Sequence, residues 1–143
     1  MAVELDHSFS TTKSIDDSYA AILDLERIVP AVDGGSVTER TSEDSAKAEI
    51  KVKMGAMSLT FVGTVDVIEK DDADHRAVLE VKSREKGGQG YANAKVTFNL
   101  NDGGGDIHTS AQISGKAASM GEGVMVGVLD ALINDFTTKL PNI

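Results

Sequence analysis

The sequence contains no cysteine and no tryptophan, and aromatic residues of any kind are few. Without cysteine the protein forms no disulfide, no thiolate metal site and no cysteine nucleophile. Aromatic residues make up only 4% of the 143 residues, so large side chains that could fill a core are in short supply. The length suits one domain, residues 1–143, built around a single core.

Positive charge and long apolar runs are also scarce. The chain has 14 Lys and Arg against 23 Asp and Glu, a formal net charge of −9. Nucleic acid is therefore a poor candidate partner, and charge alone would hold an anionic membrane poorly. The N-terminal residues, MAVELDHSFS, lack the basic and apolar regions of a signal peptide. No run approaches the ~18 apolar residues of a membrane helix, so we expect a soluble, cytoplasmic protein with at most peripheral contact at the inner face of the cell membrane.

Signals of catalytic chemistry are few. The three histidines, His7, His75 and His108, show no metal-ligand spacing, and no G-x-S-x-G nucleophile motif occurs. Gly88-Gln89-Gly90 lacks the third glycine of a dinucleotide-binding loop. His7 falls on the inner face of the first expected strand, where a hydrogen-bonded core histidine is the simpler interpretation. We therefore predict that the protein is not an enzyme and has neither catalytic nor metal-binding residues.

Alternation of apolar and polar residues dominates the sequence and predicts β-strands. The first strand places Val3, Leu5, His7 and Phe9 on one face. Residues 50–67, IKVKMGAMSLTFVGTVDV, alternate on both sides of a tight turn, which predicts a hairpin with one apolar wall and a candidate entrance for a ligand at the turn. Several strands exceed the usual length of about 5–6 residues, and long antiparallel strands tend to curl. The six strands expected after the first are 36–41, 45–54, 57–70, 76–86, 89–101 and 105–116.

Two short helices are expected between the first strand and the next. Ser14 or Asp16 can cap the first of them, since their side chains accept from free N–H groups of the first turn. A second short helix is predicted near Asp24–Val29 and should end at Pro30. The buried stripe of the first helix would be Tyr19, Ile22 and Leu23.

A long helix is expected at the C-terminus, from about Met120 to Leu140. Ser119 and Glu122 have the spacing of a capping box, and Pro141 should end the helix. One long helix must bury its apolar stripe against the concave face of a strongly curved antiparallel sheet, which predicts an α+β domain. The stripe consists of Val124, Met125, Val128, Leu129, Leu132, Phe136 and Leu140.

The inward face of the expected sheet carries many Ala, Gly, Ser and Thr side chains. Either the helix packs closely on them, or they line a cavity for an apolar ligand in which Met side chains form flexible walls. Tyr19 either presents its hydroxyl near the cavity mouth or leaves it in water, and Gly123-x-x-x-Gly127 is interpreted as a groove facing the sheet or a ligand. The candidate ligand-binding residues are Tyr19, Met54, Met57, Leu59, Phe61, Leu79, Val81, Ala92, Ala94, Val96, Phe98, Met120, Gly123, Val124, Met125, Gly127, Val128 and Leu132.

Four stretches together resemble one known family. They are ELDHSFS, AAILDLERIVPAVDGG, KVKMGAMSLTFVGTVDVIEKD and GGQGYANAKVTFNL. Their order and spacing are similar to the CoxG family of carbon monoxide dehydrogenase, within the START-like (SRPBCC), helix-grip superfamily, over about residues 4 to 140. The sequence departs from the family where Leu25 and Asp33 stand, because members often have proline at these two places.

The resemblance implies a curved seven-stranded antiparallel sheet that grips the long C-terminal helix around an apolar cavity. It also implies a non-catalytic accessory role beside a molybdenum–copper CO dehydrogenase. From this we hypothesise a carrier without a covalently bound cofactor, which binds a menaquinone-type isoprenoid quinone or a lipid and links that enzyme to the membrane quinone pool.

Two alternatives stay open. The protein could be a docking or maturation factor of the dehydrogenase that needs no ligand. It could also be an enzyme of the cyclase or aromatase type found elsewhere in the superfamily, for which His7, Ser83 and Thr109 are the inward polar groups.

Overall fold

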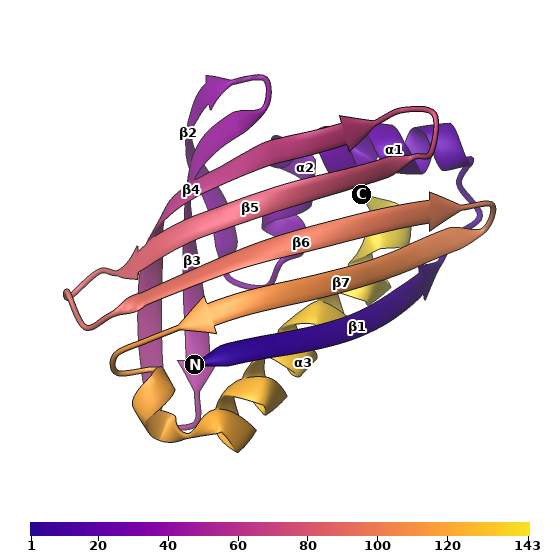
Figure 1. The fold of residues 1–143 in the computed structure, drawn as a ribbon. Coiled ribbons are helices and arrows are strands. Elements are labelled where there is room, and N and C mark those ends of the chain that lie inside the picture. The colour runs from indigo at the N-terminus through magenta and orange to yellow at the C-terminus, as the bar shows by residue number, and fades with distance from the viewer.

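The computed structural model describes all 143 residues and contains one sheet and three α-helices (Figure 1). None of the helices is both long enough and apolar enough to cross a membrane. The elements in chain order are β1 (Ala2–Ser10), α1 (Ile15–Leu23), α2 (Leu25–Ile28), β2 (Gly35–Ser42), β3 (Ser45–Met54), β4 (Met57–Asp71), β5 (Arg76–Glu85), β6 (Tyr91–Asn101), β7 (Gly104–Ile113) and α3 (Glu122–Lys139).

The seven strands form one antiparallel sheet in the order β1-β7-β6-β5-β4-β3-β2. Each hairpin joins neighbours in sequence, and β1 closes the far edge by pairing with β7. The predicted hairpin at the middle of the chain is confirmed, with Met54 paired to Met57. The last two strands are shorter than expected, because the chain leaves the sheet at Gly90 and Gly115, which both have positive φ.

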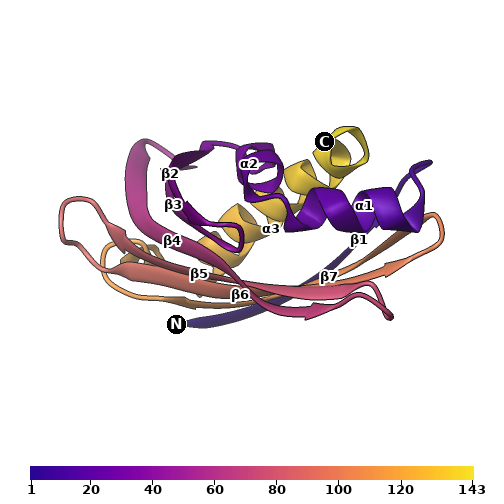
Figure 2. The same cartoon turned by 90° about the horizontal axis from the view of Figure 1, so that it is seen from above.

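The sheet curls strongly, and all three helices lie on its concave face (Figure 2). Part of the curl comes from β4, a strand of 15 residues. At Gly63 this strand approaches β5 so closely that an added Cβ would lie 1.8 Å from the carbonyl oxygen of Lys82. Only glycine therefore fits there without a shift of the backbone. A bulge between Val67 and Glu69 adds a further bend.

The short helices begin where the sequence predicts. Ser14 caps α1 by accepting from the N–H of Asp17 at 3.1 Å, and Asp24 caps α2 by accepting from that of Glu26. Pro30 does not end α2 directly, because it lies within a following 3₁₀ turn, Val29–Ala31. Proline is tolerated there since the first residues of a helix need no N–H donor.

The long helix is shorter than predicted at both ends. The capping box is wrong: Ser119 donates its hydroxyl to the carbonyl of Lys116 inside a 3₁₀ turn, and Gly121, with φ 99°, precedes α3 without a side-chain cap. At the other end Pro141 lies inside a 3₁₀ turn, Leu140–Asn142, after the helix has ended at Lys139.

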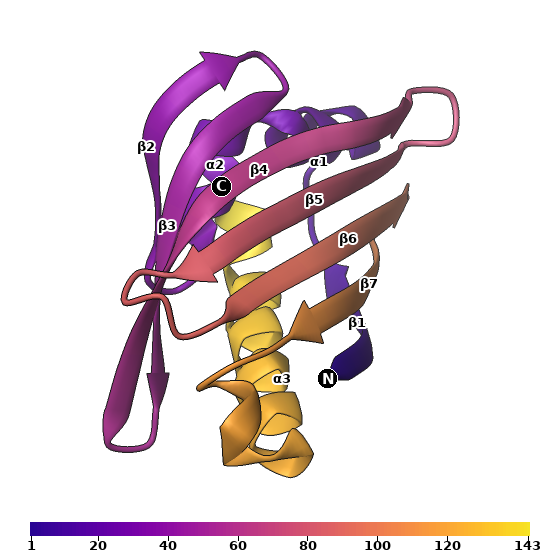
Figure 3. The same cartoon turned by 60° about the vertical axis from the view of Figure 1, so that its left-hand side comes forward.

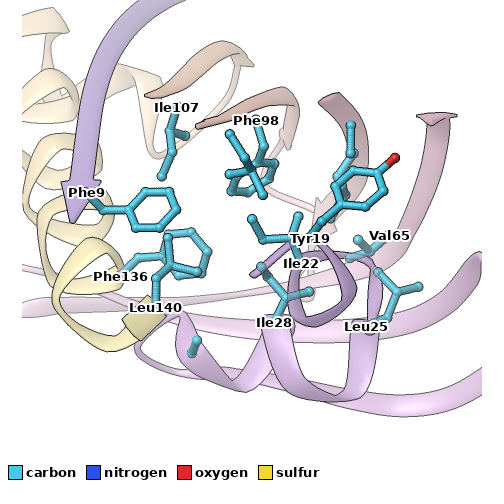
Figure 4. Close-up of a cluster of buried hydrophobic side chains, with 14 of the residues drawn as sticks. Phe9, Tyr19, Ile22, Leu25, Ile28, Val65, Phe98, Ile107, Phe136 and Leu140 are labelled. Atoms are coloured by element: carbon cyan, nitrogen blue, oxygen red, sulfur yellow. The ribbon is translucent and has the colours of Figure 1, made fainter. Parts of the chain in front are cut away.

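Buried side chains form two clusters at opposite ends of the concave face. One cluster joins α1, α2 and the end of α3 to the sheet, and in it Phe98 meets Phe136 edge to face at 6.3 Å (Figure 4). The other gathers around Met54, Phe61 and Met125, near the β3–β4 hairpin and the start of α3. The space between the two clusters is where a cavity forms.

Candidate functional site

A cavity of about 260 Å³ lies between the concave face of the sheet, α3 and the segment that joins α2 to β2. Of its 31 lining residues, 24 are hydrophobic, so the interior is almost wholly apolar. The small residues of the inner face therefore leave space open, and close packing of the helix on the sheet is not the outcome.

The floor of the cavity is built by β3 to β7 and its roof by α3. Strand alternation turns every second side chain of each strand to the floor, for example Leu79 and Val81 on β5. The roof residues recur at helical spacing along one face of α3. They are Met125, Val128, Leu129, Leu132, Ile133 and Phe136.

The mouth of the cavity lies between α3 and the β2–β3 edge of the sheet. In Figure 3, α3 runs apart from β3, while its contacts with the sheet are chiefly with β1 at the other edge. Apolar lining residues on both sides of this gap are only half-buried, whereas floor residues such as Phe98, 2% exposed, are closed off from water. The half-buried residues are Val29, Val32, Ile50, Leu129, Leu132 and Ile133.

Two polar side chains of the lining are buried and face inward, Ser83 and Thr109. Ser83 donates its hydroxyl to the carbonyl of Ala92 at 2.5 Å, so its proton is already used. The hydroxyl of Thr109 is buried and has no hydrogen-bond partner. The chain contains no cluster of His, Asp and Glu that could hold a metal ion.

The profile of one protein family matches residues 8–142, almost the whole chain. The chain belongs to the CoxG family of carbon monoxide dehydrogenase. This confirms the resemblance drawn from the four sequence stretches. No curated protein matches the sequence.

Solved structures show that this CoxG-family chain has a START-like, helix-grip fold, as expected. A conserved protein from Geobacillus kaustophilus superposes with a TM-score of 0.78 at 20% identity, over 99% of this chain and 93% of that one. The Zhui aromatase/cyclase from Streptomyces sp. R1128 gives 0.61 at 11% identity, over 98% and 94%. A START superfamily protein from Mycobacterium smegmatis gives 0.58 at 9% identity, over 98% and 94%. At such identities the likeness concerns the fold alone.

The CoxG-family cavity brings together most of the residues that the sequence singled out for ligand binding. Eleven of them line it: Met54, Phe61, Leu79, Val81, Ala92, Ala94, Val96, Phe98, Met125, Val128 and Leu132. Seven do not: Tyr19, Met57, Leu59, Met120, Gly123, Val124 and Gly127. That the eleven bind a ligand stays a prediction. The Gly55-Ala56 turn is also outside the lining, so the mouth is not at the hairpin tip.

Tyr19 braces α1 against the sheet and does not reach the cavity. Its ring is buried and meets His75 edge to face at 5.4 Å, and its hydroxyl donates to the carbonyl of Arg76 at 3.3 Å. In Figure 4 the hydroxyl points away from the neighbouring core side chains. Burial, together with the carboxylate of Asp72, raises the pKa of Tyr19 to about 12. Neither expected position, the cavity mouth or open water, describes it.

Gly123 and Gly127 face solvent, so they form no groove toward the sheet or the cavity. Both are exposed, and a Cβ added to either would meet nothing within 4 Å. Val124 is exposed on the same side, at 44%. The apolar side chains of α3 spread around the helix, so their spacing did not decide which face turns inward.

Sequence reasoning missed the lining residues that come from outside the strands. Ile28, Val29 and Val32 belong to α2 and the turn after it, where no periodic pattern marks an inner face. Leu129 and Ile133 lie on the predicted helix, and their spacing from Met125 could have identified them as members of the same face.

Proposed function

We propose that this protein is a non-catalytic carrier that binds a menaquinone-type isoprenoid quinone, or a related lipid, and serves a molybdenum CO dehydrogenase. The observation that carries the proposal is the apolar cavity beneath α3. Burial of a hydrocarbon chain contributes ~0.8 kcal/mol per CH₂, which is enough to compete with a bilayer when the cavity excludes water. Membership of the CoxG family supplies the link to the dehydrogenase.

The size of the cavity indicates which part of such a ligand it would hold. At about 260 Å³ it lies below the ~300–1,000 Å³ of pockets that enclose drug-sized molecules. A long isoprenoid chain would exceed it, so the ring and the first isoprene units would lie inside. The remainder would leave through the apolar mouth between α3 and β3.

Solvent extraction and native mass spectrometry of protein purified without detergent test this proposal. We expect a quinone or lipid to copurify, and the empty protein to take up menaquinone added in vesicles. The proposal fails if the cavity stays empty in repeated preparations and added menaquinone does not bind.

The two rival functions make different demands on the molecule. A docking or maturation factor needs an exposed patch, but the most exposed large apolar residues, Val62, Ile68, Tyr91 and Val124, are spread over β4, β6 and α3. A pull-down of the dehydrogenase that is indifferent to filling the cavity would favour this rival. A cyclase needs acid and base groups inside, and the buried inward-facing polar side chains of the lining are Ser83 and Thr109.

A further inference from the structure

Two buried polar atoms near the cavity have no partner. The hydroxyl of Thr109, a residue that is 5% exposed, makes no hydrogen bond, and neither does Nδ1 of His7, whose side chain is 7% exposed. Buried polar groups in folded proteins are almost always paired, so each exception calls for a ligand, a water or a function.

The two residues are neighbours on the concave face. β1 pairs with β7 so that His7 is opposite Ile107 and Leu5 is opposite Thr109. His7 and Thr109 are therefore diagonal neighbours on one face, about 7–8 Å apart at the backbone. Thr109 is part of the cavity wall, and threonine in a strand can turn either its hydroxyl or its methyl group in a given direction.

The hydrogen-bonding roles of the pair follow from Asp130 on α3. Nε2 of His7 lies 2.7 Å from Oδ1 of Asp130. A carboxylate only accepts, so Nε2 carries the proton, and Nδ1 of the neutral ring is left as an acceptor. Asn134 donates to the other oxygen of Asp130 at 3.1 Å and holds the carboxylate in place. His7 thus offers a fixed acceptor, and Thr109 offers a free donor.

We propose that Thr109 and His7 form a polar subsite at the β1–β7 side of the cavity that binds the hydroxyl group of an otherwise apolar ligand. The ligand oxygen accepts from Thr109 and donates its own proton to Nδ1 of His7. A phenol or a quinol satisfies both groups, whereas an ether or a quinone carbonyl satisfies only Thr109. The inference rests on the proposed carrier function and specifies that the hydroxyl form is preferred, with its ring beneath α3 and its chain toward the mouth.

Binding of two matched probes, 4-decylphenol and its methyl ether 4-decylanisole, tests the subsite by titration calorimetry. The ether is the more apolar, so a purely hydrophobic cavity would prefer it. We expect the unmodified protein to bind the phenol about tenfold more tightly, the effect of one or two hydrogen bonds. Thr109→Val, which keeps the shape but removes the hydroxyl, should abolish this preference, and Thr109→Ser should retain it.

The outcomes separate this inference from the carrier function. If both probes bind but Thr109→Val changes neither affinity, the subsite is refuted, and the hydroxyl is instead satisfied by a water or by His7. If the unmodified protein binds neither probe, the carrier function fails and the subsite with it. His7→Phe provides an independent check, since it should lower the affinity for the phenol while leaving that for the ether unchanged.

Discussion

At the scale of single residues, the cavity exists because certain floor positions carry very small side chains. Ala92 and Ala94 stand next to each other in the inward series of β6, where larger residues would reach toward α3. Because the chain has no tryptophan, no side chain of that size compensates elsewhere. The open space is therefore a property of a few positions, and one substitution should close it.

Ala94→Trp should fill the cavity and lower the affinity for menaquinone or decylphenol by at least about tenfold, because the indole would occupy the ligand's place. The new tryptophan is the only one in the chain, so its emission should be shifted to the blue, as for an apolar surrounding. Ala131→Trp, on the exposed side of α3, is the matched control and should bind normally with red-shifted emission. Unchanged affinity in Ala94→Trp would mean that the ligand binds elsewhere.

Sequence alone predicted the inward residues of the strands well and those of α3 poorly. In a strand the side chains alternate strictly, so the pattern around Ala94 and Phe98 has only two possible faces. In α3, Val124 and Met125 are adjacent and equally apolar, yet one is 44% exposed and the other is 3% exposed. The rotation of the helix is set by its packing on β1, which no local pattern records.

At the scale of secondary-structure elements, the same residue type serves opposite roles in β4 and α3. Gly127→Ala should stabilise the protein by up to about 1 kcal/mol, because alanine favours the helix and its methyl group meets open space. Gly63→Ala should destabilise it, because the added Cβ would collide with the backbone of Lys82. Urea unfolding of both variants measures the two effects. Destabilisation by Gly127→Ala would show that the exposed face of α3 is covered in solution.

The edge strand β1 depends in part on the protonation of His108 on β7. A hydrogen bond to the carboxylate of Asp6 is the main cause that raises the pKa of His108 above its usual 6.5, with a smaller contribution from Glu4. A raised pKa means that the protonated form is stabilised in the folded state. Its contribution is therefore complete below about pH 6.5 and is lost as the pH rises through the folded pKa.

We therefore expect the pairing of β1 with β7 to weaken slightly between about pH 6 and pH 8, as amide hydrogen exchange of β1 can show. The effect is small because both side chains are exposed. His108→Asn should remove the pH dependence, and Asp6→Asn should lower the pKa of His108 in an NMR titration. An unshifted titration in Asp6→Asn would assign the raised pKa to other groups.

Element boundaries were harder to predict than element types, and the start of α3 shows why. Ser119 and Glu122 have capping-box spacing, but the spacing does not exclude a competing local hydrogen bond. The serine hydroxyl is used by the carbonyl of Lys116 in the preceding 3₁₀ turn, and the helix begins after Gly121. Short polar side chains near a helix end have several nearby backbone partners, so a motif alone does not choose among them.

At the scale of the whole molecule, two core clusters hold the sheet and α3 at either end while the middle stays open. The clusters around Phe98 and Met54 supply the burial that keeps the helix in place without filling the cavity. This division accounts for a stable fold in a chain that has few large side chains. It also leaves the mouth, with its half-buried Ile50 and Leu132, as the path by which a ligand would pass.

The net charge of −9 determines how this mouth should approach a bilayer. Uptake of menaquinone should be slower from anionic than from neutral vesicles at ~0.01 M salt, where charges act over ~30 Å, and the difference should vanish near 1 M, where they act over ~3 Å. Stopped-flow fluorescence with a membrane-bound quencher measures the rates. Ala94→Trp, which should take up no quinone, gives the background for both vesicle types. Faster uptake from anionic vesicles would instead reveal a local basic surface that overrides the net charge and recruits the protein to lipid.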